Sequence, residues 1–198
     1  WVYAVTVVNP NDKTTVRGVR VRLVGTADLE SNGLMVTGGE EQYIDVEISG
    51  SRSDLKELNS SSLEAIADVS SISSAGDFDV SWTLDPPSNI ASGDIKLVSS
   101  TANKISVKVS ERKVRPEVPV VVEYGGDLAH GYVPNDAVLT TDTLSVSGPA
   151  EEVNQIVSAV VTVDLQGRTD TISGDFTYTF VDQDNNVIDT SGYLTVSV

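Results

Sequence analysis

The fold is decided by Val46-Glu47-Ile48-Ser49-Gly50, a stretch whose pattern returns as Leu144-Ser145-Val146-Ser147-Gly148. The two Ser-Gly pairs lie 98 residues apart. Two more matches share this offset: Gly33 with Gly131, and Gly76-Asp77-Phe78 with Gly174-Asp175-Phe176. Three separated matches at one offset indicate two tandem copies of a single unit.

Apolar and polar residues alternate along much of both copies. A period of two is typical of strands with one buried face. It predicts strands at 19–23, 44–48, 78–84 and 105–109 in the first copy, and at 118–122, 144–146, 176–180 and 194–198 in the second. We expect 105–109 and 194–198 to be equivalent closing strands. Pro119 cannot donate a hydrogen bond to a ladder, so its strand is expected at a sheet edge.

A short helix is predicted after each Ser-Gly pair. Leu55 with Leu58, and Val153 with Ile156, have the i, i+3 spacing of one helix face. Pro149 suits the first helical position. The fold class is therefore mainly β with one short helix per repeat. The expected domains are residues 1–113 and 114–198, joined at 114–117.

These motifs, in this order and in two copies, resemble YbbR-like domains, and the resemblance covers nearly the whole chain. It is carried by 1–5, by the Ser-Gly turns, by the helical segment 151–156, and by Asp68-Val69-Ser70 and Asp164-Leu165-Gln166-Gly167. The copies differ at one carrier position, where Ser51 stands in the first and Pro149 in the second.

The resemblance implies a fold similar to the C-terminal domain of ribosomal protein L25 homologues. It also implies a membrane-anchored protein with its repeats on the extracellular face of a Gram-positive cell, held by a transmembrane helix upstream of Trp1. In Firmicutes the family member encoded beside the membrane diadenylate cyclase regulates that enzyme, so the cyclase is the expected partner in cyclic di-AMP signalling. Trp1 and Tyr3 suit the end of a membrane span, although they also suit a strand.

Composition narrows the function further. The net charge of −16 and pI of about 4.2 provide no basic footprint for nucleic acid. The absence of cysteine excludes disulfide scaffolds, thiolate metal sites and cysteine nucleophiles. The charge itself indicates solubility rather than an acidic binding face.

The candidates for chemistry are few. His130 is interpreted as a loop residue, since no nucleophile elbow accompanies it. The segment 182–186 carries oxygen ligands but not the Gly and Glu of an EF-hand, so a hairpin turn is favoured over half of a calcium loop. Glu40-Glu41 and Glu151-Glu152 do not have the facing geometry of a glycosidase pair, and Gly38-Gly39 and Gly125-Gly126 are interpreted as turns or bulges.

We therefore expect a non-catalytic interaction module with no catalytic, cofactor-binding or metal residue and with no assignable partner-binding residue. A cell-wall or extracellular ligand is a second expected partner. The alternative is a structural or cell-wall-associated spacer or adhesion module without a signalling role. A calcium- or carbohydrate-binding domain and an unrecognised hydrolase are further alternatives.

Overall fold

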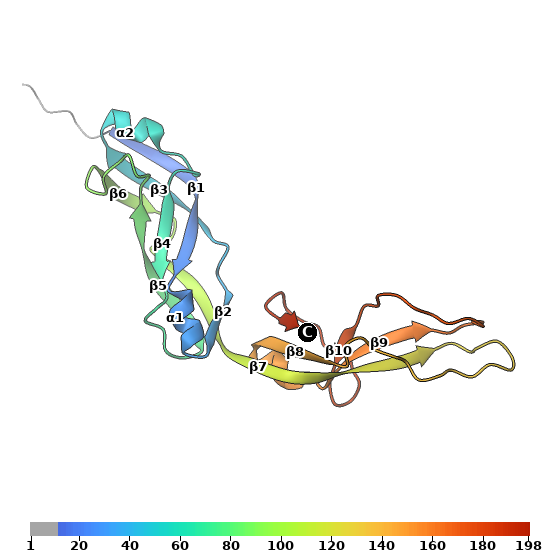
Figure 1. The fold of residues 1–198 in the computed structure, drawn as a ribbon. Coiled ribbons are helices and arrows are strands. Elements are labelled where there is room, and N and C mark those ends of the chain that lie inside the picture. Colours follow the sequence, from blue (N-terminus) through green and yellow to red (C-terminus); the bar gives the residue numbers. More distant parts are fainter. Residues whose placement is uncertain (1–11) are drawn as a thin grey trace, which may run out of the picture. The chain divides into compact units, whose positions relative to one another are not determined.

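The computed structural model describes residues 12–198, which form two compact units divided between Ser110 and Glu111 (Figure 1). The predicted boundary after Lys113 lies three residues further on, inside the long strand β7 (Lys104–Gly125). The predictions made for Trp1 and Tyr3 fall outside the described residues.

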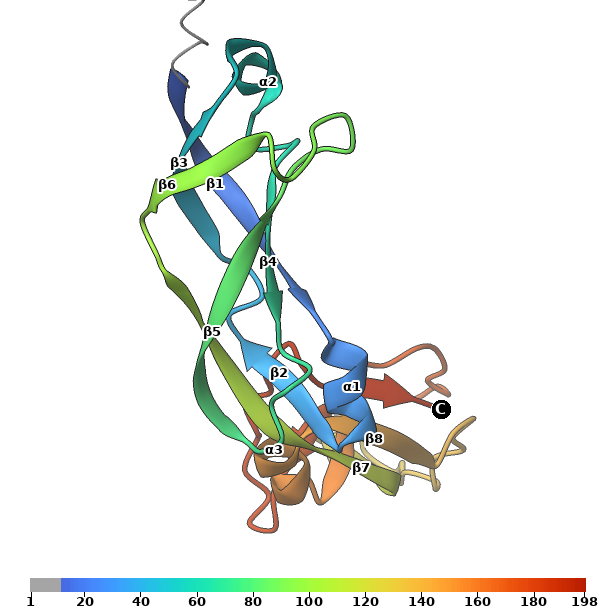
Figure 2. The same ribbon diagram turned by 90° about the vertical axis from the view of Figure 1, so that its left-hand side faces the viewer.

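The first unit is one mixed sheet with two short helices. Its sheet order is β7–β5–β4–β1–β3–β6, and β2 also pairs with β7. Figures 1 and 2 show β1 running between β3 and β4, and only the β1–β4 ladder is parallel within this unit. The elements are β1 (Asp12–Val24), α1 (Thr26–Ser31), β2 (Leu34–Gly38), β3 (Tyr43–Gly50), α2 (Arg52–Glu57), β4 (Glu64–Asp68), β5 (Gly76–Asp85), β6 (Ile95–Ser100) and the first part of β7.

The second unit repeats the central part of this sheet. Its order is β10–β9–β7–β8–β11, in which each strand has the neighbours that β5, β4, β1, β3 and β6 have in the first unit. The ladder between β7 and β9 is parallel, as is that between β1 and β4. The elements are the rest of β7, β8 (Thr143–Pro149), α3 (Ala150–Gln155), β9 (Ser158–Asp164), β10 (Thr179–Val181) and β11 (Thr195–Ser197). The prediction of two similar β-rich units is confirmed.

Each unit has its own hydrophobic core, built from the inward-facing residues of its alternating strands. Val46 and Ile48 are fully buried in the first core, and Val146 and Val118 are fully buried in the second. Burying such side chains stabilises a unit by about 1.5–3 kcal/mol each. The alternation read from the sequence therefore assigned the buried face correctly.

The Ser-Gly pairs occupy equivalent places at strand crossings. A Cβ at Gly50 would lie 3.1 Å from the backbone oxygen of Asp94, next to β6. A Cβ at Gly148 would lie 2.4 Å from Cδ2 of Leu194, just before β11. Glycine is required because the neighbouring chain approaches where a side chain would stand.

The predicted helices after these pairs are present as α2 and α3. Leu55 and Val153 lie inside them and are buried, and Leu58 and Ile156 cap their C-terminal ends. Pro149 is the N-cap rather than the first helical residue, with φ −56 and ψ 130. The sequence did not predict α1, which has no helical counterpart in the second unit.

The strand that contains Pro119 is central, so its prediction as an edge strand is wrong. β7 lies between β8 and β9. Pro119 pairs with Thr143 of β8, and the ladder to β9 begins only at Val120. The proline is tolerated because it stands where one ladder ends and the other begins.

The segment 114–117, predicted to join the units, is part of β7 and contains a β-bulge. The register shifts between Arg115 and Val118, and Glu117 has φ 60. In β1 the register shifts between Val16 and Val19, where Gly18 has φ 67. The two bulges are equivalent and bend the opening strand of each unit.

The predicted equivalence between 105–109 and 194–198 is wrong. Residues Thr195–Ser197 form β11 and pair with β8, as β6 pairs with β3. Residues Lys104–Val109 instead pair with β5. Both segments show the same alternation, but alternation identifies a buried face and not the neighbouring strand.

Candidate interaction surfaces

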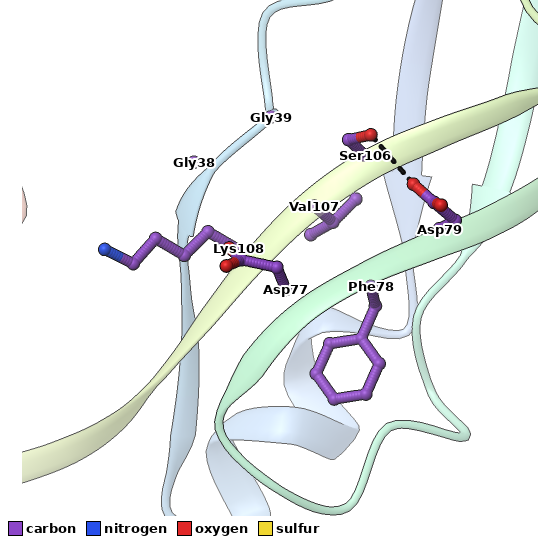
Figure 3. A pocket seen from close by; sticks show the side chains of 8 residues that line it. All are labelled: Gly38, Gly39, Asp77, Phe78, Asp79, Ser106, Val107 and Lys108. Carbon is purple, nitrogen blue, oxygen red and sulfur yellow. Dashed lines mark hydrogen bonds between the residues drawn. The ribbon is translucent and has the colours of Figure 1, made fainter.

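The larger of two hollows in the first unit lies where β2 ends against β5 and β7 (Figure 3). It is open and measures about 390 Å³, lined by Gly38, Gly39, Asp77, Phe78, Asp79, Ser106, Val107 and Lys108. The predicted turn at Gly38-Gly39 is confirmed in its second residue, because Gly39 has φ 95 just after β2.

Polar contacts hold this hollow in place. The Gln42 side chain donates to the carbonyl of Gly39 at 2.8 Å and to that of Ser106 at 2.7 Å. The Ser106 hydroxyl donates to the Asp79 carboxylate at 2.8 Å, as Figure 3 shows. A Cβ at Gly39 would lie 2.4 Å from the Ser106 carbonyl oxygen. These residues therefore serve the architecture, and their polar atoms do not converge on the open space.

A second hollow of about 320 Å³ lies over β1, β3 and the turn after β6. Asp45 is central to it, because its carboxylate accepts a hydrogen bond from the Gly18 amide at 2.9 Å. The Asp45 amide donates to the Thr101 hydroxyl at 3.0 Å. The carboxylate thus fixes the bulge of β1, which gives it a structural task.

His130 lies in a turn between β7 and β8 and is exposed. Gly131 follows with φ 89, and the Tyr132 amide donates to the Ala129 carbonyl at 3.1 Å. The interpretation as a loop histidine is confirmed. No hydrogen bond links its ring to a hydroxyl or a carboxylate in the described part of the chain, so it is not arranged as a general base.

The segment 182–186 forms a turn after β10. The Asp182 amide donates to the Asn186 carbonyl at 3.0 Å, and Asn185 has φ 62. The Asp182 carboxylate accepts from the amides of Asp184 and Asn186, each at 2.9 Å. Hydrogen bonding from Asn186 is the main reason that the pKa of Asp182 is lowered. The carboxylate that would have to bind calcium is therefore already committed to the turn.

The paired glutamates do not face one another. Glu151 and Glu152 lie in the first turn of α3, where carboxylates favour the helix dipole, and Glu152 accepts from the Ser191 amide at 3.0 Å. Glu40 and Glu41 lie in the loop between β2 and β3, not on a strand as the sequence suggested. Within residues 12–198, no three His, Cys, Asp or Glu side chains are grouped as a metal site would require.

Searching for a membrane span among residues 12–198 finds no helix of sufficient length and apolar character.

Comparison with known proteins identifies the family. The YbbR-like protein family matches residues 19–109 and again residues 118–198, so the chain belongs to it and carries two YbbR-like units. Among solved structures, the chain is similar to a YbbR-like protein from Streptococcus pneumoniae, with 17% identity, a TM-score of 0.47 and coverage of 95% of this chain and 90% of that one. It is also similar to a YbbR-like domain from Listeria monocytogenes, with 20% identity, a TM-score of 0.37 and coverage of 50% and 94%. No curated protein matches it.

The likeness to ribosomal protein L25 homologues stays a prediction. Sequence reasoning missed the surfaces that depend on strand pairing, which are the hollow beside Gly39 and the edges of the second unit. The pair Gly38-Gly39 was visible in the sequence, but the strand that lies against it was not.

Proposed function

We propose that this chain is a non-catalytic interaction module of a membrane-anchored protein on the extracellular face of a Gram-positive cell, and that the full-length protein modulates a membrane diadenylate cyclase. The anchor helix of the full-length protein contacts the cyclase in the membrane, and the YbbR-like units bind a cell-wall or other extracellular ligand. No step in this role requires turnover of a substrate.

Membership of the YbbR-like family across both units carries the proposal, because family members encoded beside the cyclase regulate it. Strand edges support an interaction role. β6 is an edge strand whose Leu97 and Val98 are 45% and 42% exposed, and edges of this kind accept partner strands. The net charge of −16 disfavours adsorption to anionic lipids and nucleic acids.

The test is the cellular level of cyclic di-AMP. The cyclase is co-expressed with the full-length protein, with a form that keeps the anchor but lacks residues 12–198, or with an empty vector. A catalytically inactive cyclase gives the background. We expect the full-length protein to change the nucleotide level and the truncated form to change it by a different amount.

Equal effects of the two forms would assign regulation to the anchor and leave these units as spacers. No effect of either form would overturn the cyclase proposal and favour the alternative, a cell-wall-associated structural module. Expression of both forms is checked by immunoblotting of the membrane fraction, so that a missing effect is not a missing protein.

A further inference from the structure

The segment Gly174–Tyr178 of the second unit has aromatic side chains at alternate positions that remain exposed. Phe176 is 45% exposed and Tyr178 is 39% exposed. Their neighbour Phe180 is buried in β10, and its ring contacts that of Tyr178 with centroids 5.3 Å apart. Within residues 12–198, no strand pairs with Gly174–Tyr178. Alternating aromatics of this kind usually belong to a strand with a covered face.

The same motif is covered in the first unit. Gly76-Asp77-Phe78 opens β5 and pairs antiparallel with the first part of β7. Phe78 lies opposite Val107, and Val80 lies opposite Ile105. Phe78 and Val80 are consequently half-buried and pack against the first core. Cross-strand pairs of aromatic and β-branched residues are among those that stabilise a sheet.

Charge follows the same register. Asp77 lies directly opposite Lys108 on the exposed face of the β5–β7 ladder. Asp175 occupies the place of Asp77 in the second copy of the motif. A cationic residue opposite Asp175 would complement it, and the net charge of −16 favours a cationic partner over an acidic one.

The second unit does not supply its own covering strand among the described residues. Its last strand, β11, pairs with β8 and so takes the place of β6. β10 pairs with β9 only over Thr179–Val181. The counterpart of Lys104–Val109, which covers β5 in the first unit, is therefore not provided by the chain from Glu111 to Val198.

We propose that Gly174–Tyr178 is a docking edge for an antiparallel strand from another YbbR-like unit, with the chemistry of Lys104–Val109. The docking strand places aliphatic β-branched residues opposite Phe176 and Tyr178 and a lysine opposite Asp175. Main-chain hydrogen bonds provide affinity, and the alternating side chains provide register and specificity. This inference does not depend on a role in cyclase regulation.

The test uses the whole chain and a synthetic peptide of residues 104–110, Lys-Ile-Ser-Val-Lys-Val-Ser. Amide NMR spectra and hydrogen exchange are recorded with and without the peptide. We expect shifts and new protection at residues 175–178. A peptide of the same composition with its alternation broken should produce neither.

Matched variants identify the contacts. Phe176→Ser should weaken binding by about tenfold or more, because it removes the largest apolar contact of the edge. Asp175→Lys should weaken binding of this cationic peptide and restore it for a peptide with glutamate in place of its second lysine. Val138→Ser is the control, since Val138 is 98% exposed and lies in the loop between β7 and β8.

Three outcomes would overturn the inference. The amides of 175–178 are already protected without peptide, so the edge is occupied. Peptide-induced changes appear at Gly76–Ser81, so the peptide has displaced the chain's own β7. Sedimentation shows self-association that Phe176→Ser abolishes in the absence of peptide, so a further copy covers the edge in place of the proposed strand.

Discussion

The Asp68 carboxylate accepts a hydrogen bond of 2.9 Å from the backbone amide of Ser70. Hydrogen bonding from the backbone and side chain of Ser70 lowers the pKa of Asp68. The second unit repeats the contact, with Asp164 accepting from the Gln166 amide at 2.9 Å. The turn after the parallel strand is thus closed by the same device in both units.

A left-handed glycine makes room for this turn, and replacing it should destabilise the first unit. Gly25 has φ 82, and a Cβ there would lie 2.7 Å from the Ser70 amide nitrogen and 2.8 Å from Asp68 Oδ1. Gly25→Ala should lower the free energy of unfolding by about 2 kcal/mol or more, combining backbone strain with the clash. Urea denaturation followed by Trp82 fluorescence, in a Trp1→Phe background, measures it.

Gly33→Ala is the matched control for this substitution. Gly33 also has a positive φ, 72, but a Cβ there would meet nothing within 4 Å. It should cost only the left-handed strain of about 1 kcal/mol. Equal losses for the two variants would show that the close approach at Gly25 does not matter.

Truncating a core residue of the second unit should act mainly on that unit. Ile156 is fully buried in the second core and Ile48 in the first. Ile156→Ala should cost about 2–5 kcal/mol, through lost burial and the cavity left behind. Hydrogen exchange should become faster in β8 and β9, while the Trp82 unfolding midpoint moves less. Ile48→Ala should give the reverse pattern, and identical effects of both variants on Trp82 would contradict two separate cores.

The repeat in the sequence predicted much of the fold because it fixes positions that packing requires. Gly50 and Gly148 are glycines because a neighbouring chain passes where a Cβ would stand. Leu55 and Val153 are apolar because each anchors a short helix to its core. These constraints are local, so they leave a trace at a fixed offset.

Strand pairing left no such trace, and the interaction surfaces depend on it. The alternation of Ile105 and Val107 resembles that of Leu194 and Val196, yet the first pair covers β5 and the second lies at β8. α1 was missed because Leu29 is its only buried residue and gives no periodic pattern. The open edge at Phe176 follows only from knowing which strand covers Phe78.

The lowered pKa of Asp182 makes the second unit sensitive to acid. The folded value lies below the ordinary 3.8, so the ionised carboxylate contributes stability that is fully present above the unfolded pKa. That contribution is lost as the pH falls through the folded value. Asp182→Asn should therefore flatten the decline of stability at acidic pH. Carboxyl NMR titration should place the midpoint of Asp182 below 3.8, and a midpoint at or above 3.8 would contradict these hydrogen bonds.

Calcium should not bind at the same turn. Asp182 already accepts from two backbone amides, and the Asn186 side chain donates to its second oxygen at 3.2 Å. Binding calcium would require these hydrogen bonds to break. Titrating calcium into the whole chain in a calorimeter should give only the heat of dilution. A saturable heat that disappears in Asp182→Asn would instead identify a calcium loop.

The left-handed residue of this turn offers a comparison between two substitutions. Asn185 has φ 62, and its side-chain amide donates to Glu123 at 3.3 Å. Asn185→Gly and Asn185→Val both remove that donor, so any difference between them reports the backbone. Glycine adopts this conformation freely, whereas a β-branched residue is strained there by about 1–2 kcal/mol. Urea unfolding followed by circular dichroism should therefore find Asn185→Val less stable than Asn185→Gly by that amount. Equal stability of the two variants would mean that the left-handed turn is not needed to keep β10 in place.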